Sequence, residues 1–592
     1  MTMARSELRR RVVRAGLLAA VAIVYLCLVG MVQAFSTRNI VGGNLPLSRI
    51  LLLLPSAVAA SLAVRPRVRG GVTMELNMGE AAGAGASIGL IAGAAVAVGI
   101  GIVNLIGQEA VRGVFNAVTS ALLLTLTLQR STVVGTAILV ALSTATGALF
   151  ALAGVLAPRL RRPIVTGLTV VLLMGMLQSV VRVMLVQLGL ATQWLYSVTF
   201  GGLTYLGAVA SFAAGMAGAR LWALRREAAA ADAAERAEAG GRPRIPRAML
   251  LVPVGFVLLA LPALLGTFLS AVLGQVGIFV LMGLGLNIVV GYAGLLDLGY
   301  VAFFAVGAYA TGVLTAAVNS GSSLHPGLPF LLAVPIVVLI AVAAGLLIGG
   351  PVLRLRGDYL AIVTLGFGEI ARVLVTSDWL KSFLGGAQGL IAIPAPTMSV
   401  GGLHIDFRNP QPFYYLALGF CLLAAFVSWR LANSRVGRAW NAMREDEQVA
   451  EAMGVSTVRY KLLAFACGAA IGSLGGALFA VQIGSLAPSS FVFFISIQSL
   501  AIIILGGMGS IPGVIVGALV LVGLPGFLTE FAEYQPLIYG AVLVAIMLYR
   551  PEGLIPNVRR TRELHEEEVE QDAWLEGVPE PAPSMTLGEA VE

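Results

Sequence analysis

Side chains that could catalyse a reaction or hold a metal are few in this sequence of 592 residues. Its histidines and cysteines are His325, His404, His565, Cys27, Cys421 and Cys467. The histidines lie far apart, and the cysteines sit in apolar stretches without the paired spacing of disulfides or metal ligands. No nucleophile–base pair is visible either. The sequence therefore predicts no catalytic residue, no metal and no cofactor.

Nucleotide hydrolysis by this chain is not predicted. The sequence contains two lysines, Lys381 and Lys461. Neither lysine follows the glycines of a Walker-type phosphate-binding loop, so the chain lacks the residues that would hold a nucleotide's phosphates.

A charged segment between two apolar runs is the most informative part of the chain. It extends from Asn433 to Gly454 and mixes charged residues with small apolar ones. Asn433 or Ser434 can cap a first short helix, and Gly454 is placed to end a second. A plain connection would be short and polar, whereas this amphipathic segment suits a surface that docks into another protein.

Glycines inside apolar runs are the second candidate site. Gly291 and Gly294 lie close to Asn287, and a glycine cluster precedes Pro512. Such glycines can interrupt a membrane helix and expose backbone groups to a substrate or to cavity water. Close packing of helices through small residues is the alternative explanation.

Charged residues inside apolar runs are also candidates. Glu369 and Arg372 lie one helical turn apart and can pair. Charge at membrane depth is costly and points to function, although a structural pair explains it equally well. Asp297 lies at an expected break between spans, where an acidic residue is ordinary. The residues assigned to a substrate pathway are Asn287, Gly291, Gly294, Thr364, Glu369, Gly506, Gly507 and Gly509.

The composition indicates what must position these residues. The chain is 58% hydrophobic and 11% charged, which is typical of a membrane protein. Its net charge of +8 is carried by arginines that cluster beside the ends of apolar runs. This is the pattern of the positive-inside rule, so the partner it indicates is membrane lipid and not nucleic acid.

The first half of the chain predicts six spans, since about 20 apolar residues cross a bilayer. They are residues 15–34, 47–64, 82–106, 133–156, 163–188 and 197–222. The first is predicted to be an uncleaved span, because no convincing cleavage site follows it. The apolar stretch from Val114 to Leu128 is too short to span and is predicted to be re-entrant or interfacial.

The second half predicts ten more spans. They are residues 248–269, 272–290, 296–317, 329–350, 358–377, 412–430, 461–484, 493–508, 511–530 and 535–549. Arginine placement puts both termini and loop 431–460 in the cytoplasm, and loop 378–411 outside. The fold expected is an all-α, polytopic transmembrane bundle of roughly 16 spans with broken or re-entrant segments.

Four regions follow from this pattern. Residues 1–224 form an N-terminal membrane domain, and residues 225–247 form a charged cytosolic linker. Residues 248–556 form a second membrane domain. Residues 557–592 form an acidic tail that is expected to be disordered.

Five segments between residues 275 and 555 resemble one known family. The run from Ala439 to Phe465 resembles the coupling loop of LivM-type permeases of branched-chain amino acid ABC importers. The other matches are Gly285–Gly294 with Leu298–Tyr309, Arg354–Glu369, Gly506–Gly513 and Tyr549–Leu554. They follow the order of the family, which makes the resemblance specific.

The resemblance implies a non-catalytic permease subunit of the inner membrane. Its partners would be a second, LivH-like permease, two cytosolic ABC ATPases and an extracytoplasmic solute-binding protein. The ATPases would hydrolyse ATP and move the loop helix, tipping the spans between inward-open and outward-open states. The residues it assigns to ATPase coupling are Arg444, Glu445, Asp446, Ala450, Glu451, Ala452, Met453 and Gly454.

Residues 1–224 lie outside the segments that resemble this family, and their six predicted spans are additional to the permease region. Two short patterns in this region are similar to patterns in the second half. Arg159-Leu-Arg followed by Thr166 resembles Arg354-Leu-Arg followed by Thr364. The segment Leu76–Gly83 resembles Leu286–Gly294. A degenerate duplication of a permease front part is one interpretation. An unrelated membrane anchor is the other.

Three further functions remain as alternatives to the import of branched-chain amino acids. The same machinery could move urea, amides or another small polar solute. An ion-coupled secondary transporter would need membrane-buried carboxylates and no amphipathic loop. An intramembrane enzyme is disfavoured by the missing catalytic groups.

Overall fold

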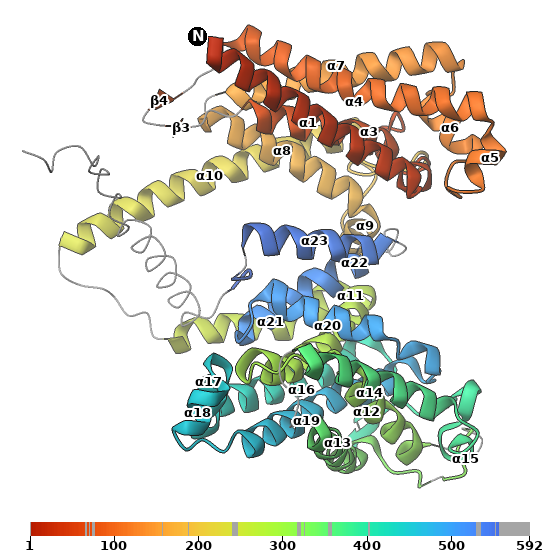
Figure 1. Ribbon diagram of the computed structural model, residues 1–592, viewed down its shortest axis with the longest axis vertical. Coiled ribbons are helices and arrows are strands. Elements are labelled where there is room, and N and C mark those ends of the chain that lie inside the picture. Colours follow the sequence, from red (N-terminus) through yellow and green to blue (C-terminus); the bar gives the residue numbers. More distant parts are fainter. Residues whose placement is uncertain are drawn as a thin grey trace, which may run out of the picture. The chain divides into compact units, whose positions relative to one another are not determined.

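The computed structural model describes residues 2–64, 68–69, 72–73, 77–156, 158–187, 189–238, 247–316, 321–324, 326–352, 358–400, 403–527, 534–550 and 552–555. The tail 557–592 and the expected cytoplasmic arginines Arg354 and Arg356 lie outside these ranges. The chain divides into two compact units, Met1–Leu250 and Leu251–Glu592, and both are built from helices (Figure 1). The expected polytopic helical bundle is confirmed.

The described residues of the first unit form ten helices and two short hairpins. The helices are α1 (Thr2–Leu28), α2 (Met31–Ala34), α3 (Leu47–Ala63), α4 (Met78–Ile106), α5 (Gln108–Arg112), α6 (Ser120–Leu126), α7 (Thr132–Val155), α8 (Pro158–Met176), α9 (Gln178–Gln187) and α10 (Tyr205–Glu238). Strands β1 (Asn39–Val41) and β2 (Leu45–Pro46) form one hairpin, and β3 (Val68–Arg69) and β4 (Val72–Thr73) form the other. The expected interfacial stretch contains α6, whose seven residues are too few to span a bilayer.

Small residues hold α4 against α7 in this unit. A Cβ atom on Gly85 would collide with the carbonyl of Gly147, and one on Gly89 would collide with that of Ser143. The hydroxyl of Ser143 donates to the carbonyl oxygen of Gly89 over 2.9 Å. Without side chains between them, the two backbones approach closely, as membrane helices commonly do.

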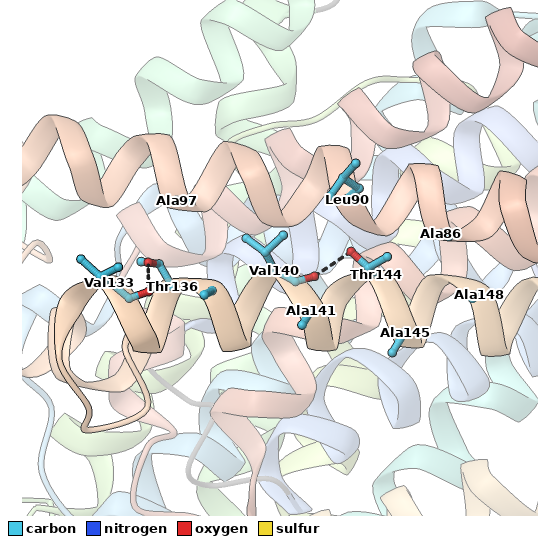
Figure 2. Close-up of a pocket in the computed structure, with 11 residues that line it drawn as sticks. Ala86, Leu90, Ala97, Val133, Thr136, Val140, Ala141, Thr144, Ala145 and Ala148 are labelled. Atoms are coloured by element: carbon cyan, nitrogen blue, oxygen red, sulfur yellow. Dashed lines mark hydrogen bonds between the residues drawn. The ribbon is translucent and has the colours of Figure 1, made fainter.

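A groove of about 740 Å³ runs along the outside of the α4–α7 pair (Figure 2). It is lined mainly by Ala86, Leu90, Ala97, Ala141, Ala145 and Ala148. The hydroxyls of Thr136 and Thr144 on its wall donate to carbonyls of their own helix. No polar group converges on the groove, so it offers a ligand nothing beyond apolar surface.

The second unit carries the segments that the motifs singled out. Its first half contains α11 (Arg247–Leu286), the π-helix η1 (Asn287–Tyr292), α12 (Val301–Thr315), α13 (Phe330–Val352), α14 (Asp358–Thr376), α15 (Lys381–Leu384), the 3₁₀ turn η2 (Gly386–Gln388), and strands β5 (Thr397–Val400) and β6 (Leu403–Asp406). Its second half contains α16 (Pro410–Ala432), α17 (Arg435–Glu445), α18 (Glu447–Ala452), α19 (Thr457–Ile483), the 3₁₀ turn η3 (Pro488–Ser490), α20 (Phe493–Gly506), α21 (Ile511–Ala518), the π-helix η4 (Leu519–Gly523), α22 (Leu524–Phe527) and α23 (Gln535–Tyr549).

Helix α19 is the core of this unit. It is rich in glycine and alanine, and it packs against both α12 and α13 (Figure 1). A Cβ on Gly307 of α12 would collide with the backbone of Ser473, and one on Gly476 would collide with the carbonyl of Phe304. The absence of side chains at these positions lets α12 lie directly on α19.

Each of the sixteen predicted spans contains helix. Among the described residues, ten helices are long and apolar enough to cross a membrane, or eleven if the bent pair α8–α9 is one span. Several other predicted spans are shorter apolar helices, such as Leu47–Ala63 and Val301–Thr315. Helix α11 covers the predicted span 248–269 and most of 272–290, and it is broken at Gly266, near the end of the first, where φ is 75°.

Candidate functional site

The amphipathic loop folds as two short helices with a cap on each. The Ser434 hydroxyl accepts from the backbone N–H groups of Val436 and Gly437 and starts α17. The Asp446 carboxylate accepts from those of Gln448 and Val449, at 2.8 and 3.0 Å, and starts α18. Gly454, with φ of 87°, follows the end of α18. The predicted Ser434 cap and the glycine stop are therefore confirmed.

One face of this helix pair is fixed to the membrane helices. Trp440 is fully buried, and its indole N–H donates to the carbonyl oxygen of Tyr460 over 2.8 Å. Lys461 at the start of α19 donates to the Glu447 carboxylate over 2.6 Å. Ala450 of α18 is also buried. These contacts join α17, α18 and α19, so that a push on the loop reaches α19.

The opposite face of α18 is open. Met453 and Val449, one turn apart, are 80% and 58% exposed. Glu445, Glu451 and Ala452 are exposed beside them. An exposed apolar pair with acidic neighbours is the surface that a partner's groove would cover.

Arg444 connects the loop to the broken span. Its Nη1 donates to the carbonyl oxygen of Gly291 over 2.8 Å. Gly291 lies in the last turn of η1, where a helix leaves carbonyl groups without partners in the next turn. Gly294 follows with φ of 72°, and a Cβ there would lie 2.7 Å from Cγ of Arg444. Arg444 therefore packs directly against the break.

Asn287 joins this break to a second one. It is fully buried, and its Oδ1 accepts from the backbone N–H of Gly509 over 2.8 Å. Gly509 lies in the turn between α20 and α21 and has φ of 79°. A Cβ on Gly291 would collide with Oδ1 of Asn287. We define Asn287, Gly291, Gly294, Arg444 and Gly509 as the η1 junction.

The loop from Ala293 to Tyr300 is held by three other helices. The backbone N–H of Leu298 donates to Oγ1 of Thr364 on α14 over 3.1 Å. The Tyr300 hydroxyl donates to the carbonyl oxygen of Gly468 on α19 over 2.7 Å. The N–H of Val301 donates to Oγ of Ser496 on α20 over 3.0 Å. Displacement of the η1 junction thus reaches α14, α19 and α20 together.

Asp297 in this loop is more unusual than expected. The carboxylate is 2% exposed, and its Oδ1 accepts from the N–H of Gly299 over 2.9 Å. Its Oδ2 is buried without a hydrogen-bond partner. A buried acid is costly unless its oxygens are paired, so the residue is not an ordinary loop end.

The remaining predicted residues lie in two other places. Gly506 packs against Gly513, and a Cβ on Gly507, whose φ is 115°, would lie 2.7 Å from the carbonyl oxygen of Ile555. Leu554 and Ile555 donate to the carbonyls of Leu505 and Gly506 over 2.8 and 2.9 Å. Without side chains at these glycines, the segment 552–555 packs directly against the backbone at the end of α20.

Glu369 pairs with Arg372 on α14, as predicted, with 2.9 Å between Oε2 and Nε. The two side chains are 45% and 40% exposed, respectively. In the described part of the chain, the contacts of this pair do not connect it to the η1 junction. Because both side chains are exposed at the surface of the helix bundle, a structural role suits the pair better than contact with a buried substrate.

The sequence arguments missed the residues that hold the junction. Trp440 lies within the loop, in α17, and Lys461 lies shortly after it, in α19. A tryptophan or one of only two lysines in or near a docking segment is a signal that the sequence offered. The sequence contains no signal for Ser496 and Tyr300, because their hydrogen-bond partners lie 195 and 168 residues away. Among the described residues, no group of three or more His, Cys, Asp or Glu side chains could hold a metal ion.

Comparison with known proteins covers this second unit. A family model described as branched-chain amino acid transport system / permease component matches residues 268–549. The high-affinity branched-chain amino acid transport system permease protein LivM of Escherichia coli is 40% identical over 301 residues, which are 48% of this chain and 68% of that protein. No solved structure matches the chain.

Two more distant relatives extend the comparison. A probable branched-chain amino acid transport permease protein LivM of Methanocaldococcus jannaschii is 27% identical over 45% of this chain and 81% of its own length. The permease protein LivH of the Escherichia coli system is 27% identical over 31% of this chain and 63% of its own. The matched region contains the η1 junction and the amphipathic loop, and the resemblance of residues 275–555 is confirmed.

Proposed function

Since the chain belongs to the branched-chain amino acid transport permease family, we propose that it is the permease subunit of an ABC importer for these amino acids. It is a multi-pass membrane protein, and its relatives are transport permeases. The bond between Arg444 and Gly291 supports an externally driven permease over an ion-coupled carrier or an intramembrane enzyme. It connects the amphipathic loop to a broken span, which a subunit driven from outside itself requires.

The proposed cycle begins at the exposed face of α18. One of two partner ATPases docks on Val449, Glu451 and Met453, and the pair hydrolyses ATP in the cytoplasm. Their closure displaces α17, and Arg444 carries the displacement to η1. Because Asn287 binds η1 to the turn at Gly509, both breaks move together and expose the path to the other side of the membrane.

The other partners and the orientation follow from the same proposal. A second, LivH-like permease completes the pathway, and a solute-binding protein delivers the amino acid to the side opposite the loop. The loop and both termini then face the cytoplasm, in agreement with the arginine clusters. Urea and amides remain as alternative cargo if the amino acids are not transported.

We propose that residues 1–224 form an accessory membrane domain in addition to the permease domain 248–556. The echo between the two halves does not extend to the structural environment. Thr166 is exposed and Asn77 is exposed, whereas Thr364 and Asn287 are buried. A duplicated permease front would repeat the buried contacts of Thr364 and Asn287, so an anchoring role suits the domain better.

Copurification tests the docking surface. The chain is expressed with its partner subunits, and we expect a P-loop ATPase to purify with the wild type and to be lost in Glu451→Lys. Asp378→Lys is the matched control, because Asp378 is an exposed acid after α14, away from the loop. Loss of the ATPase in both variants, or in neither, would contradict docking at α18.

Uptake tests the substrate. Cells that lack their own branched-chain uptake and contain the complete transporter are expected to accumulate labelled leucine, isoleucine and valine. Glu451→Lys should abolish this uptake while membrane insertion stays intact. Uptake that persists without the ATPases would eliminate the ABC mechanism and favour an ion-coupled carrier.

A further inference from the structure

A cluster of four aromatic rings lies at the end of the second unit that is remote from the loop. Phe304 and Tyr309 come from α12, Phe479 from the end of α19, and Phe491 from the turn before α20. Ring centroids are 5.1 Å apart for Phe304 and Phe479, and 5.4 Å for Tyr309 and Phe491. Phe491 also lies 5.8 Å from Phe304 and 6.0 Å from Phe479. We call these residues the aromatic cluster.

One polar atom is enclosed with these rings. The hydroxyl of Tyr309 is buried and has no hydrogen-bond partner, and the residue is 3% exposed. Burying a hydroxyl without a partner is unfavourable, and lipid cannot supply one. By contrast, Tyr300 on the same stretch of chain donates to Gly468. Phenylalanine would fill the same space without this cost, and the Tyr309 hydroxyl is free to donate to a ligand.

We propose that Tyr309 binds the substrate, and that its hydroxyl donates to the carboxylate of the transported amino acid. This inference rests on the proposed function. A phenol is a good donor to a carboxylate, and a hydrogen bond to a charged group is stronger than one between neutral groups. Phe304, Phe479 and Phe491 provide the apolar wall that an aliphatic side chain requires.

The neighbouring backbone shows how the cluster is covered. Leu390 and Leu486 exchange two backbone hydrogen bonds, of 3.0 and 2.7 Å. A Cβ on Gly312, three residues beyond Tyr309, would lie 2.8 Å from Cδ1 of Leu390. The segment around Leu390 therefore lies over α12 and is bonded to the turn that leads to Phe491. For an amino acid to reach the Tyr309 hydroxyl, that turn must separate from α12.

The test compares two tyrosines in the complete transporter, reconstituted in proteoliposomes with its partner subunits. Tyr309→Phe removes an unpaired hydroxyl, so its melting temperature should be equal to or above that of the wild type. Its rate of leucine uptake should fall about tenfold, since a bond to a charged group is lost. Tyr300→Phe removes a paired hydroxyl and should lower the melting temperature.

Wild-type uptake by Tyr309→Phe would overturn the inference, and so would a fall in uptake that accompanies a lower melting temperature. A second measurement uses photo-leucine, a diazirine analogue, on the same complexes. It should label peptides that contain Phe304, Phe479 or Phe491, and excess leucine should compete. Labelling elsewhere in the chain, or equal labelling of Tyr309→Phe, would overturn it. If the wild-type transporter moves no branched-chain amino acid, the proposed function fails instead.

Discussion

Arg444 and Gly291, which are 153 residues apart in sequence, are joined by a hydrogen bond of 2.8 Å between a guanidinium group and a backbone carbonyl. One belongs to a loop with an exposed apolar face, and the other to a π-helix inside a broken span. A π-helix is a strained local form that is frequent at functional sites. In the proposed cycle, this bond carries the movement of the loop to a π-helix in a broken span.

Arg444→Ala should uncouple the protein. The variant leaves the Gly291 carbonyl without its charged donor, so we expect the interaction between the loop and η1 to lose about 1.5–3 kcal/mol of free energy. The rate of leucine uptake should fall at least tenfold. Uptake and ATP hydrolysis are measured on the same proteoliposomes, and hydrolysis should persist. Arg438→Ala, which changes an exposed arginine on the same helix, should keep the wild-type melting temperature. Full uptake by Arg444→Ala would refute the route.

Gly299→Ala should destabilise the second unit. A Cβ at this position would collide with the carbonyl of Thr364, and such overpacking costs about 1–3 kcal/mol. Gly366→Ala on α14 is the control, since nothing lies within 4 Å of its Cβ position. Alanine there should be neutral or stabilise by up to about 1 kcal/mol through helix propensity. Thermal unfolding in detergent distinguishes them, and similar midpoints would contradict the close approach of Gly299 to α14.

Asn287→Ala should weaken the link between the two breaks. It removes the acceptor that Gly509 uses and leaves a small cavity, at a cost of about 1–3 kcal/mol. Asn433→Ala removes an exposed side chain that binds only within its own turn, and it should have little effect. Hydrogen exchange of the Gly506–Gly513 segment is the measurement. Unchanged exchange in Asn287→Ala would show that the turn is held without Asn287.

The Lys461–Glu447 pair should show a measurable coupling free energy. Its nitrogen and oxygen are 2.6 Å apart, and the lysine and glutamate side chains are 5% and 24% exposed. Removing one partner leaves the other charge poorly solvated, so Lys461→Met should cost more than the double variant with Glu447→Gln. A double-mutant cycle on thermal stability should give about 0.5–3 kcal/mol. A coupling free energy of zero would mean that water already screens the pair.

Helices and caps were predictable because their signals are local. Apolar runs predicted the spans, and Ser434 and Gly454 predicted the ends of the loop helices. The η1 junction was only partly predictable. Its glycines could be recognised in the sequence. Their contacts with Arg444 and Asn287 could not, because they join residues 153 and 222 positions apart, and a periodic pattern carries no information on such distant pairs. Asp297 was misjudged for the same reason, since its burial is created by helices distant in sequence.

The small residues of α19 have a consequence for how the protein changes shape. Gly468, Gly472 and Gly476 present backbone to their neighbours, and Gly307 of α12 does the same. Two helices whose side chains interlock would have to rotate together. Helices that contact through backbone and small residues can instead undergo shear, in which one slides along the other by a small distance. Such sliding would leave the hydrogen bonds within each helix intact, so a change of shape along α19 would require no helix to unwind.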